Sequence, residues 1–180
     1  MAGGVDIVQL RDKGLDARSI LDRAVVAQGV CAEAGVPFIL NDRPDLALDL
    51  GADGVHVGQG DARPALARRM LGPDAIVGFS THAPAELDAA AGEPVDYVST
   101  GPVHETPTKL GRPGTGVGYL RHAASTTAHP FFVTGGVTPE TLPPMLEAGA
   151  RRFVVVRYLT EADDPEAEAR TLRRMIDAAW

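Results

Sequence analysis

Residues 50–58 read LGADGVHVG, in which a helix end is followed by a glycine and then by a short apolar run. The same order recurs in AGVPF at residues 34–38 and in AGARRFVVV at residues 148–156. Such a recurring step predicts a βα repeat, because glycine readily adopts the backbone conformation that ends helices. The apolar runs are too short for helices and do not alternate with polar residues, which favours a parallel sheet with both faces buried.

Extended over the whole chain, this pattern predicts seven strand–helix units. We expect strands at residues 5–10, 37–40, 54–57, 76–79, 95–99, 131–133 and 153–156. We expect helices at residues 17–34, 45–50, 64–71, 84–91, 117–124, 139–148 and 165–179. A closed barrel needs eight units, so the prediction is a (β/α)8 TIM barrel of the phosphate-binding type that lacks its first βα unit at the N-terminus, as a single domain over residues 1–180. An open doubly wound sheet is the alternative.

Composition limits the function classes. The length of 180 residues and the apolar content of 44% are typical of one globular domain. No apolar run approaches the roughly 18 residues of a membrane span, and no signal-peptide pattern is visible, so we expect no membrane partner. The single cysteine, Cys31, fits a buried helix position in a reducing, cytoplasmic protein. A net charge of −7 argues against a nucleic-acid partner and requires that anions be bound by a few placed cations and backbone amides.

Polar residues directly after each predicted strand are the candidates for the site, because active sites of parallel α/β folds lie at the C-terminal ends of the strands. The first strand is followed by Gln9–Lys13, with Arg11 and Lys13 on one face if the chain is extended. Two cations there suit a polyanion such as pyrophosphate. A solvated charged loop would have the same pattern.

Two carboxylates follow neighbouring predicted strands, Asp42 after the second and Asp61 after the third. They could share Mg²⁺ with substrate oxygens, because Mg²⁺ typically uses one or two carboxylates together with substrate and water. The alternative for Asp42 is a helix cap. His56 fits a packing role better than a ligand role. Ser80 fits a phosphate or ring-nitrogen contact and a helix cap equally well, and no nucleophile–base set supports a hydrolase serine.

The later loops offer groups for a second anion. The longest irregular stretch, residues 101–116, carries threonines and Lys109 between glycines and is typical of a lid. Gly135-Gly136 and Val156-Arg157 follow the last two predicted strands. Backbone amides of these two loops form the usual phosphate site of such barrels.

Taken together, these loops resemble the thiamine phosphate synthase family over essentially the whole chain. The matching stretches are QLRDK at Gln9–Lys13, ND at Asn41-Asp42, ADGVHVGQGD at Ala52–Asp61, GFSTH at Gly78–His82, STGPVHETPTK at Ser99–Lys109, GG at Gly135-Gly136 and GARRFVVVR at Gly149–Arg157. Each motif alone is modest evidence for the family, but the complete set in this order is specific to it.

The resemblance implies an enzyme that joins a pyrimidine methyl diphosphate to a thiazole phosphate and releases diphosphate through a dissociative mechanism. It implies a Mg²⁺ cofactor held by Asp42 and Asp61, and small-molecule substrates as the partners, and it leaves a homo-oligomer open. The groups that it implies for catalysis are Arg11, Lys13, Ser80 and Lys109. The substrate-binding set that it implies is Gln9, Leu10, Arg11, Asp12, Lys13, Asn41, Ser80, Thr106, Pro107, Thr108, Lys109, Gly136, Val156 and Arg157.

Two other interpretations stay open at this point, a thiazole tautomerase on the same barrel and a truncated, non-catalytic relative. Retention of Arg11, Lys13, Lys109 and both aspartates favours the synthase, because a tautomerase has no diphosphate to hold. Thr134 and Tyr158 depart from the family pattern, and Tyr158 could crowd the phosphate site.

Overall fold

The protein is described by a computed structural model that covers residues 1–107, 111 and 113–180. Its backbone forms two compact units. The first unit contains Met1, Val5–Ser80 and Glu93–Asp96, and the second contains Ala2–Gly4, Thr81–Gly92 and Tyr97–Trp180.

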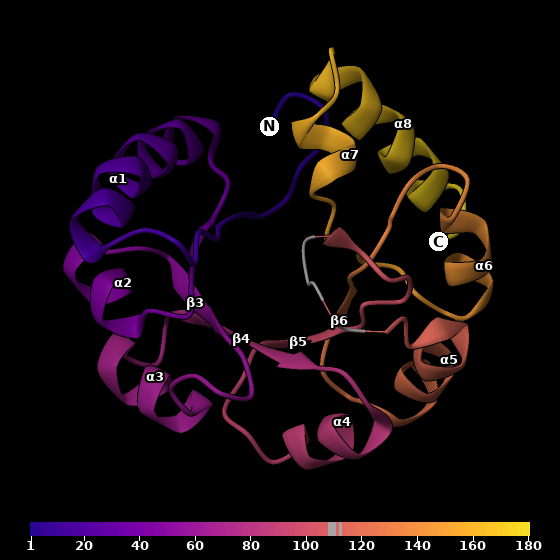
Figure 1. Cartoon of the computed structure of the whole chain (residues 1–180), viewed down its shortest axis with the longest axis horizontal. Helices are drawn as coiled ribbons and strands as arrows, with labels where there is room; N and C mark the ends of the chain where they lie inside the picture. Colours follow the sequence, from indigo (N-terminus) through magenta and orange to yellow (C-terminus); the bar gives the residue numbers. More distant parts are fainter. Residues whose placement is uncertain (108–110, 112) are drawn as a thin grey trace. The chain divides into compact units, whose positions relative to one another are not determined.

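The first unit is a parallel sheet covered by helices. Its strands are β1 (Val8–Leu10), β2 (Phe38–Asn41), β3 (Gly54–Val57) and β4 (Ile76–Thr81), whose last residue belongs to the second unit. Neighbouring strands pair in chain order, and all three pairings are parallel. The helices α1 (Ala17–Ala34), α2 (Pro44–Leu50) and α3 (Pro64–Leu71) lie along the outer side of these strands (Figure 1). The polar residues after the strands therefore share one edge of the sheet, as predicted.

The core of the first unit explains why its strands do not alternate. Strand β2 is buried from Phe38 through Leu40, and β3 is buried along its whole length. The tightly packed side chains include those of Phe38, Ile39, Leu40, Val55, Val57 and Val77. Because both faces of β2 and β3 are covered, their successive residues are mostly apolar, as is typical of parallel sheets.

Helix ends in this unit follow the sequence signals. Asp16 caps α1, because its carboxylate accepts a hydrogen bond from the backbone N–H of Ser19 at 2.9 Å. Gly35 and Gly51 end α1 and α2 in the left-handed conformation, with φ angles of 65° and 66°. Cys31 is buried in α1, and burial raises the pKa of its thiol, with the charge of Asp53 as a further cause. The cysteine is therefore in the buried helix position that was predicted.

Arg68 fastens the end of α3 to the strand that follows. Its guanidinium donates to the carbonyl oxygens of Gly72, Pro73 and Ala75 and pairs with Asp96 at 2.6 Å. The Asp96 carboxylate also accepts from the N–H of Val77 at 2.7 Å. One partly buried cation therefore satisfies several groups around the start of β4.

We expect Arg68→Met to lower the free energy of unfolding by about 1–3 kcal/mol, the cost of leaving such hydrogen-bonding groups without a partner. Urea unfolding at neutral pH measures this. The matched control is Arg69→Met, because Arg69 is the exposed neighbour on the same helix and should change stability by less than about 0.5 kcal/mol. Equal unfolding midpoints for the two variants would contradict the role given to Arg68.

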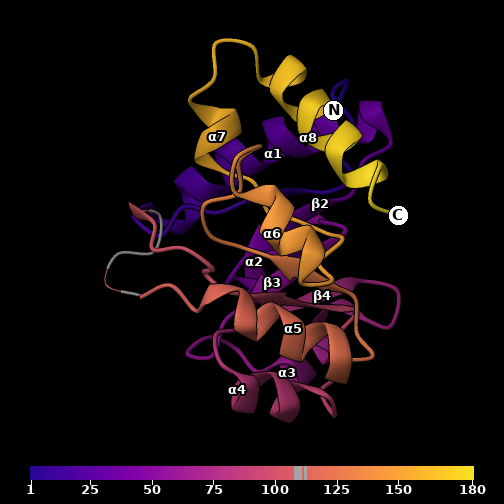
Figure 2. The same ribbon diagram turned by 90° about the vertical axis from the view of Figure 1, so that its right-hand side faces the viewer.

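The second unit combines two paired strands with five helices among its described residues. Its elements are α4 (Pro84–Ala90), β5 (Tyr97–Thr100), α5 (Gly116–Thr126), β6 (Phe131–Val133), α6 (Leu142–Glu147), α7 (Arg157–Thr160) and α8 (Pro165–Asp177). Strands β5 and β6 pair in parallel. Helices α7 and α8 pack against each other, as the two views in Figures 1 and 2 show. The core cluster lies among α5, β6, α6 and α8 and is built from Val103, Leu120, Val133, Val137, Leu142, Met145, Ala148, Ala150 and Leu172.

The strand predicted at residues 153–156 is the main difference from expectation. Phe153 makes one isolated bridge to Val133, and Val154 donates to the Val133 carbonyl at 2.8 Å, but no strand is formed there. The backbone turns at Val156 and enters the short helix α7, which the sequence pattern did not predict. The fold is thus α/β with six parallel strands in the described part of the chain, and the complete eight-unit barrel is not seen there.

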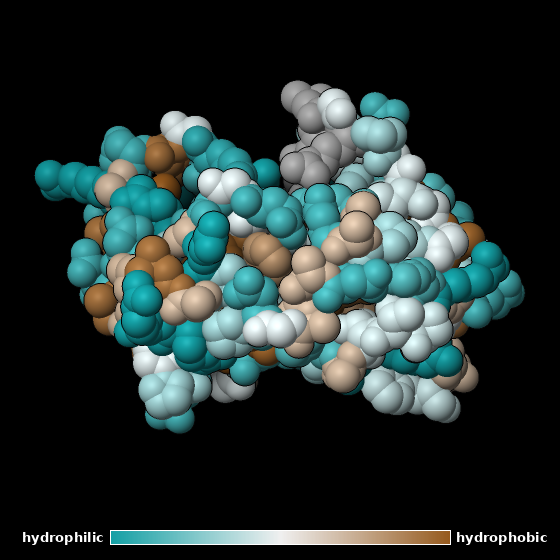
Figure 3. Space-filling view, turned by 90° about the horizontal axis from the view of Figure 1, so that it is seen from below, coloured by the Kyte–Doolittle hydropathy of each residue, from teal (hydrophilic) through white to brown (hydrophobic). Residues whose placement is uncertain are grey.

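Hydrophilic side chains cover most of the visible surface. In the face shown in Figure 3 they predominate, and hydrophobic residues form small separate groups. Among the described residues, no helix is both long and apolar enough to cross a membrane.

Candidate active site

Lys13, Asp42 and Asp61 meet at the edge of the first unit where strands β1, β2 and β3 end. The Lys13 ammonium lies 2.6 Å from a carboxylate oxygen of Asp42. Asp61 lies close enough to Asp42 for a side-chain hydrogen bond, and the charges of Asp42 and Lys13 both act on the pKa of its carboxyl group. The structure therefore brings together three of the residues that the sequence singled out, one after each of three neighbouring strands.

Asp42 has a backbone conformation that is unusual for a residue with a side chain. Its φ angle is 64°, in the left-handed region, and its N–H donates to the carbonyl of His56 at 2.8 Å. Strained backbone of this kind tends to persist at functional sites. The N-cap of α2 is Arg43, with no side-chain capping bond, so Asp42 does not cap the helix and that alternative is wrong.

The environment of Asp61 favours a cation. Burial raises the pKa of its carboxyl group, and the hydrogen bond and the negative charge of Asp42 raise the pKa further. The N–H of Gly58, which donates to Asp61 at 2.9 Å, and the charge of Lys13 act in the opposite direction. A carboxyl group whose ionisation is disfavoured by burial and by a neighbouring carboxylate is a suitable ligand for a divalent cation.

The donor set fits Mg²⁺ better than a metal held by protein ligands alone. Among the described residues, no group of three or more His, Cys, Asp or Glu side chains could hold a metal ion. Mg²⁺ does not need such a cage, because it usually binds one or two carboxylates and completes its shell with water and substrate phosphate. Asp42 and Asp61 meet that requirement.

The other predicted residues of the first unit lie in its strands or directly after them. Gln9 and Leu10 are half-buried in β1, Arg11 is exposed directly after it, and Asn41 is half-buried at the end of β2. Asp12 is used locally, since its carboxylate accepts from the N–H of Gly14 at 3.1 Å and pairs with Arg23 at 3.2 Å. Its side chain shapes the loop that carries Arg11 and Lys13.

Ser80 lies inside β4 and is not a helix cap. Its hydroxyl oxygen is 2.8 Å from Nε2 of His56, and its carbonyl accepts from the side-chain amide of Gln59 at 2.8 Å. His56 and Ser80 are both buried. The burial of His56 agrees with the packing role predicted for it. Its hydrogen bond to Ser80 was not predicted, because the two residues are 24 positions apart in the sequence.

The glycine pair after β6 forms a tight turn in the second unit. Gly135 and Gly136 have φ angles of 100° and 71°. The Gly135 carbonyl accepts from the N–H of His104 at 3.4 Å, and the Gly136 carbonyl accepts from the hydroxyl of Thr141 at 2.6 Å. These bonds fix the turn between β6 and α6 that was predicted to hold a phosphate.

Two of the predicted residues in the loop after β5 fall within the described chain. Thr106 is half-buried and Pro107 is exposed. The other two, Thr108 and Lys109, lie outside the described residues.

The last predicted pair, Val156 and Arg157, lies at the start of α7. Val156 is 43% exposed, and the Arg157 guanidinium donates two hydrogen bonds to Glu161, at 2.8 and 3.1 Å. Tyr158 turns toward α8, where its hydroxyl bonds to the Glu168 carboxylate, and this bond is the main cause that raises the tyrosine pKa to about 12. The hydroxyl of Tyr158 is therefore engaged by Glu168.

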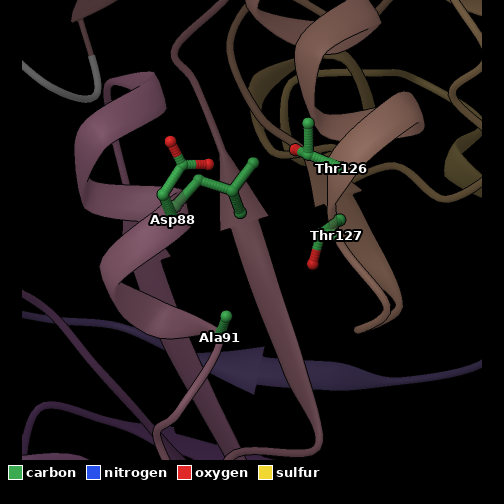
Figure 4. A pocket seen from close by; sticks show the side chains of 5 residues that line it. Asp88, Ala91, Thr126 and Thr127 are labelled. Carbon is green, nitrogen blue, oxygen red and sulfur yellow. The ribbon is translucent and has the colours of Figure 1, made fainter.

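A separate cavity of about 230 Å³ lies between α4 and α5 in the second unit (Figure 4). It is lined by Leu87, Asp88, Ala91, Thr126 and Thr127, and none of these is a predicted site residue. Its one charged side chain is the carboxylate of Asp88, which would repel a phosphate. This cavity does not suit the anions that the other loops suit.

Comparison with known proteins gives a consistent result. A family model described as thiamine monophosphate synthase matches residues 1–159. The chain is 51% identical to a thiamine-phosphate synthase of Thermus thermophilus over 98% of this chain and 85% of that protein. It is 50% identical to the thiamine-phosphate synthase of Streptomyces avermitilis over 94% of this chain and 80% of that protein.

Solved structures agree with the sequence relatives. The thiamine phosphate pyrophosphorylase of Pyrococcus furiosus superposes with a TM-score of 0.89 at 25% identity, over 99% of this chain and 86% of that one. A 3-hexulose-6-phosphate synthase superposes with a TM-score of 0.71 at 22% identity, over 94% of this chain and 86% of that one, which shows a shared fold only.

Proposed function

Because the chain belongs to the thiamine monophosphate synthase family, we propose that it joins a pyrimidine methyl diphosphate to a thiazole phosphate and releases diphosphate. Its activity as a thiamine-phosphate synthase, a transferase, is shown by the family match over residues 1–159 and by relatives that are 51% and 50% identical over nearly the whole chain. The proposal adds the substrates, the metal and the residues that hold them.

The observation that carries the proposal is the cluster of Lys13, Asp42 and Asp61 in the first unit. We assign both carboxylates to Mg²⁺ and Lys13 to the diphosphate of the pyrimidine substrate. Bound there, Mg²⁺ would neutralise charge that develops on the diphosphate as it leaves. The cluster favours a synthase over a tautomerase, because only the synthase has a diphosphate to hold.

The same substrate would also contact other residues of the first unit. Arg11 is exposed beside Lys13 and supplies a second cation, and Gln9 and Asn41 supply amides at neighbouring strand ends. The buried hydroxyl of Ser80 supplies a directional hydrogen bond. Leu10 contributes through the backbone at the end of β1, and Asp12 through the backbone of the loop that follows.

These groups suit a dissociative reaction. The bond between the pyrimidine methylene carbon and the diphosphate oxygen breaks first, and the electron pair leaves with diphosphate. The thiazole nitrogen then gives its lone pair to the cationic carbon. No proton is transferred in either step, so the reaction needs charge stabilisation at the leaving group more than it needs a general base.

The thiazole phosphate is assigned to the second unit. Backbone groups of Gly136 and Val156 and the side chain of Thr106 are the proposed contacts, with Arg157 as the cation. Arg157 is paired with Glu161, so a phosphate would have to compete with that carboxylate for the same guanidinium. Pro107, Thr108 and Lys109 are assigned from the resemblance alone.

The test is a synthase assay on the purified chain with both substrates. We expect thiamine phosphate and diphosphate in equal amounts, and we expect turnover to fall at least ~10-fold when EDTA removes divalent cations, with recovery on adding Mg²⁺. Calorimetry with diphosphate alone should show tighter binding in the presence of Mg²⁺. Failure to form thiamine phosphate would overturn the proposed reaction, and equal diphosphate affinity with and without Mg²⁺ would overturn the metal assignment.

A further inference from the structure

His56 contacts two of the proposed substrate-binding strands at once. It lies in the middle of β3, in register with Asn41 of β2 on one side and with Gly78 of β4 on the other. Its backbone carbonyl accepts from the N–H of Asp42, and its ring nitrogen Nε2 is 2.8 Å from the hydroxyl oxygen of Ser80. A single buried residue therefore touches a proposed metal ligand through its backbone and a proposed substrate contact through its side chain.

The His56 ring can orient the Ser80 hydroxyl without being needed to hold the Ser80 backbone in place. The backbone of Ser80 is held independently of the His56 ring, because the Gln59 side chain donates to the Ser80 carbonyl at 2.8 Å. A serine hydroxyl can occupy three staggered positions about the Cα–Cβ bond, whatever holds the backbone. The hydrogen bond to Nε2 favours one of them.

The direction of this hydroxyl matters for an aromatic substrate. When Nε2 accepts the hydroxyl proton, the Ser80 oxygen can face a donor such as an exocyclic amine. When Nε2 carries the proton, the Ser80 hydroxyl can act as a donor toward a ring nitrogen. In both cases the imidazole fixes which part of Ser80 faces the ligand.

We propose that His56 is a positioning residue that orients the Ser80 hydroxyl toward the pyrimidine substrate. This inference rests on the proposed function, which gives Ser80 to that substrate. It assigns His56 a role in selecting the pyrimidine and none in the chemical step, so its effect should be confined to the binding of one of the two substrates.

The experiment compares His56→Phe, His56→Gln, Ser80→Ala and the double variant His56→Phe/Ser80→Ala. We expect His56→Phe to raise KM for the pyrimidine diphosphate about 3- to 10-fold, the size of one neutral hydrogen bond, with kcat and KM for the thiazole phosphate nearly unchanged. His56→Gln should restore most of the affinity, because its amide can reach the hydroxyl. The double variant should be no worse than Ser80→Ala, since the hydroxyl is then gone.

The controls distinguish loss of the positioning role of His56 from misfolding and from failure of the proposed function. Thermal melts report on folding, and His129→Gln, a half-buried histidine outside the proposed site, should leave the kinetics unchanged. If His56→Phe does not fold, the comparison of His56→Gln with Ser80→Ala decides the matter. Additive losses in the double variant, or an equal rise in both KM values, would overturn the positioning role. A wild-type protein that makes no thiamine phosphate would overturn the proposed function itself.

Discussion

Replacing Asp61 with asparagine is expected to make the metal-free protein more stable and the enzyme slower. The pKa of Asp61 is raised in the folded protein, first by burial and then by its hydrogen bond with Asp42 and the charge of that neighbour. A carboxyl group whose pKa is raised on folding stabilises the fold at low pH, and that stabilisation is lost as the pH rises through the folded-state pKa. Near neutral pH the ionised Asp61 carboxylate therefore opposes folding, and asparagine removes that buried charge.

The activity of Asp61→Asn should fall, although its stability without metal rises. Without the Asp61 carboxylate, one charge-assisted contact to the metal is lost, which is worth about 1.5–3 kcal/mol, or roughly 10- to 100-fold in kcat/KM. Melts of both proteins in EDTA and in Mg²⁺ complete the test. Mg²⁺ should raise the Tm of the wild type and leave that of Asp61→Asn nearly unchanged.

The control for Asp61 is Asp49→Asn, which neutralises an exposed aspartate of α2. It should change neither the melting temperature in EDTA nor the response to Mg²⁺. If Asp61→Asn melts lower than the wild type in EDTA, the bond from Gly58 to Asp61 outweighs the repulsion from Asp42, and the reasoning on stability is wrong.

Gly135→Ala is expected to destabilise the second unit strongly. Gly135 has a φ angle of 100°, and an added Cβ would lie 2.6 Å from both Cβ of Pro102 and the backbone nitrogen of Val103. The backbone of Val103 cannot move aside as easily as the end of a flexible side chain. Steric overlap with the new Cβ therefore adds to the strain of the positive φ angle. We expect a loss of about 2–4 kcal/mol in the free energy of unfolding and a higher KM for the thiazole phosphate.

Gly118→Ala is the matched control, because Gly118 lies in α5 and an added Cβ there meets nothing within 4 Å. Alanine is the better helix former, so this variant should gain roughly 0.5–1 kcal/mol. Urea unfolding of both variants provides the comparison. A Gly135→Ala protein as stable as the wild type would show that the turn after β6 can rearrange.

The elements with the clearest local signals could be predicted from the sequence. The bounds of α1, α3, β3 and β6 agree with the prediction residue for residue. Glycine or proline marks most of these ends, and burial on both faces fixes the composition of the strands. The meeting of Lys13, Asp42 and Asp61 was also predictable, because parallel strands bring their C-terminal ends to one edge.

Other features depend on tertiary context that a local pattern does not contain. Residues 153–156 have the same apolar composition as true strands, but Val156 is exposed and the chain turns into α7. Ser80 precedes a proline-started helix, which favours a cap, yet β4 continues through it to Thr81. The partner of Ser80, His56, is set by strand register, which a single sequence does not give.

The ion pair between Lys13 and Asp42 joins the proposed metal ligand to the proposed diphosphate-binding cation. Each of the two side chains is therefore partly neutralised by the other. Lys13 is the counter-ion of Asp42 at 2.6 Å. A divalent cation at Asp42 would release the ammonium, and a released ammonium attracts diphosphate more strongly. Metal and substrate affinities should therefore be reciprocally coupled, each raising the other by the same factor. With such coupling, the enzyme would bind the metal or the diphosphate weakly when only one is present and would bind both more tightly when they are present together.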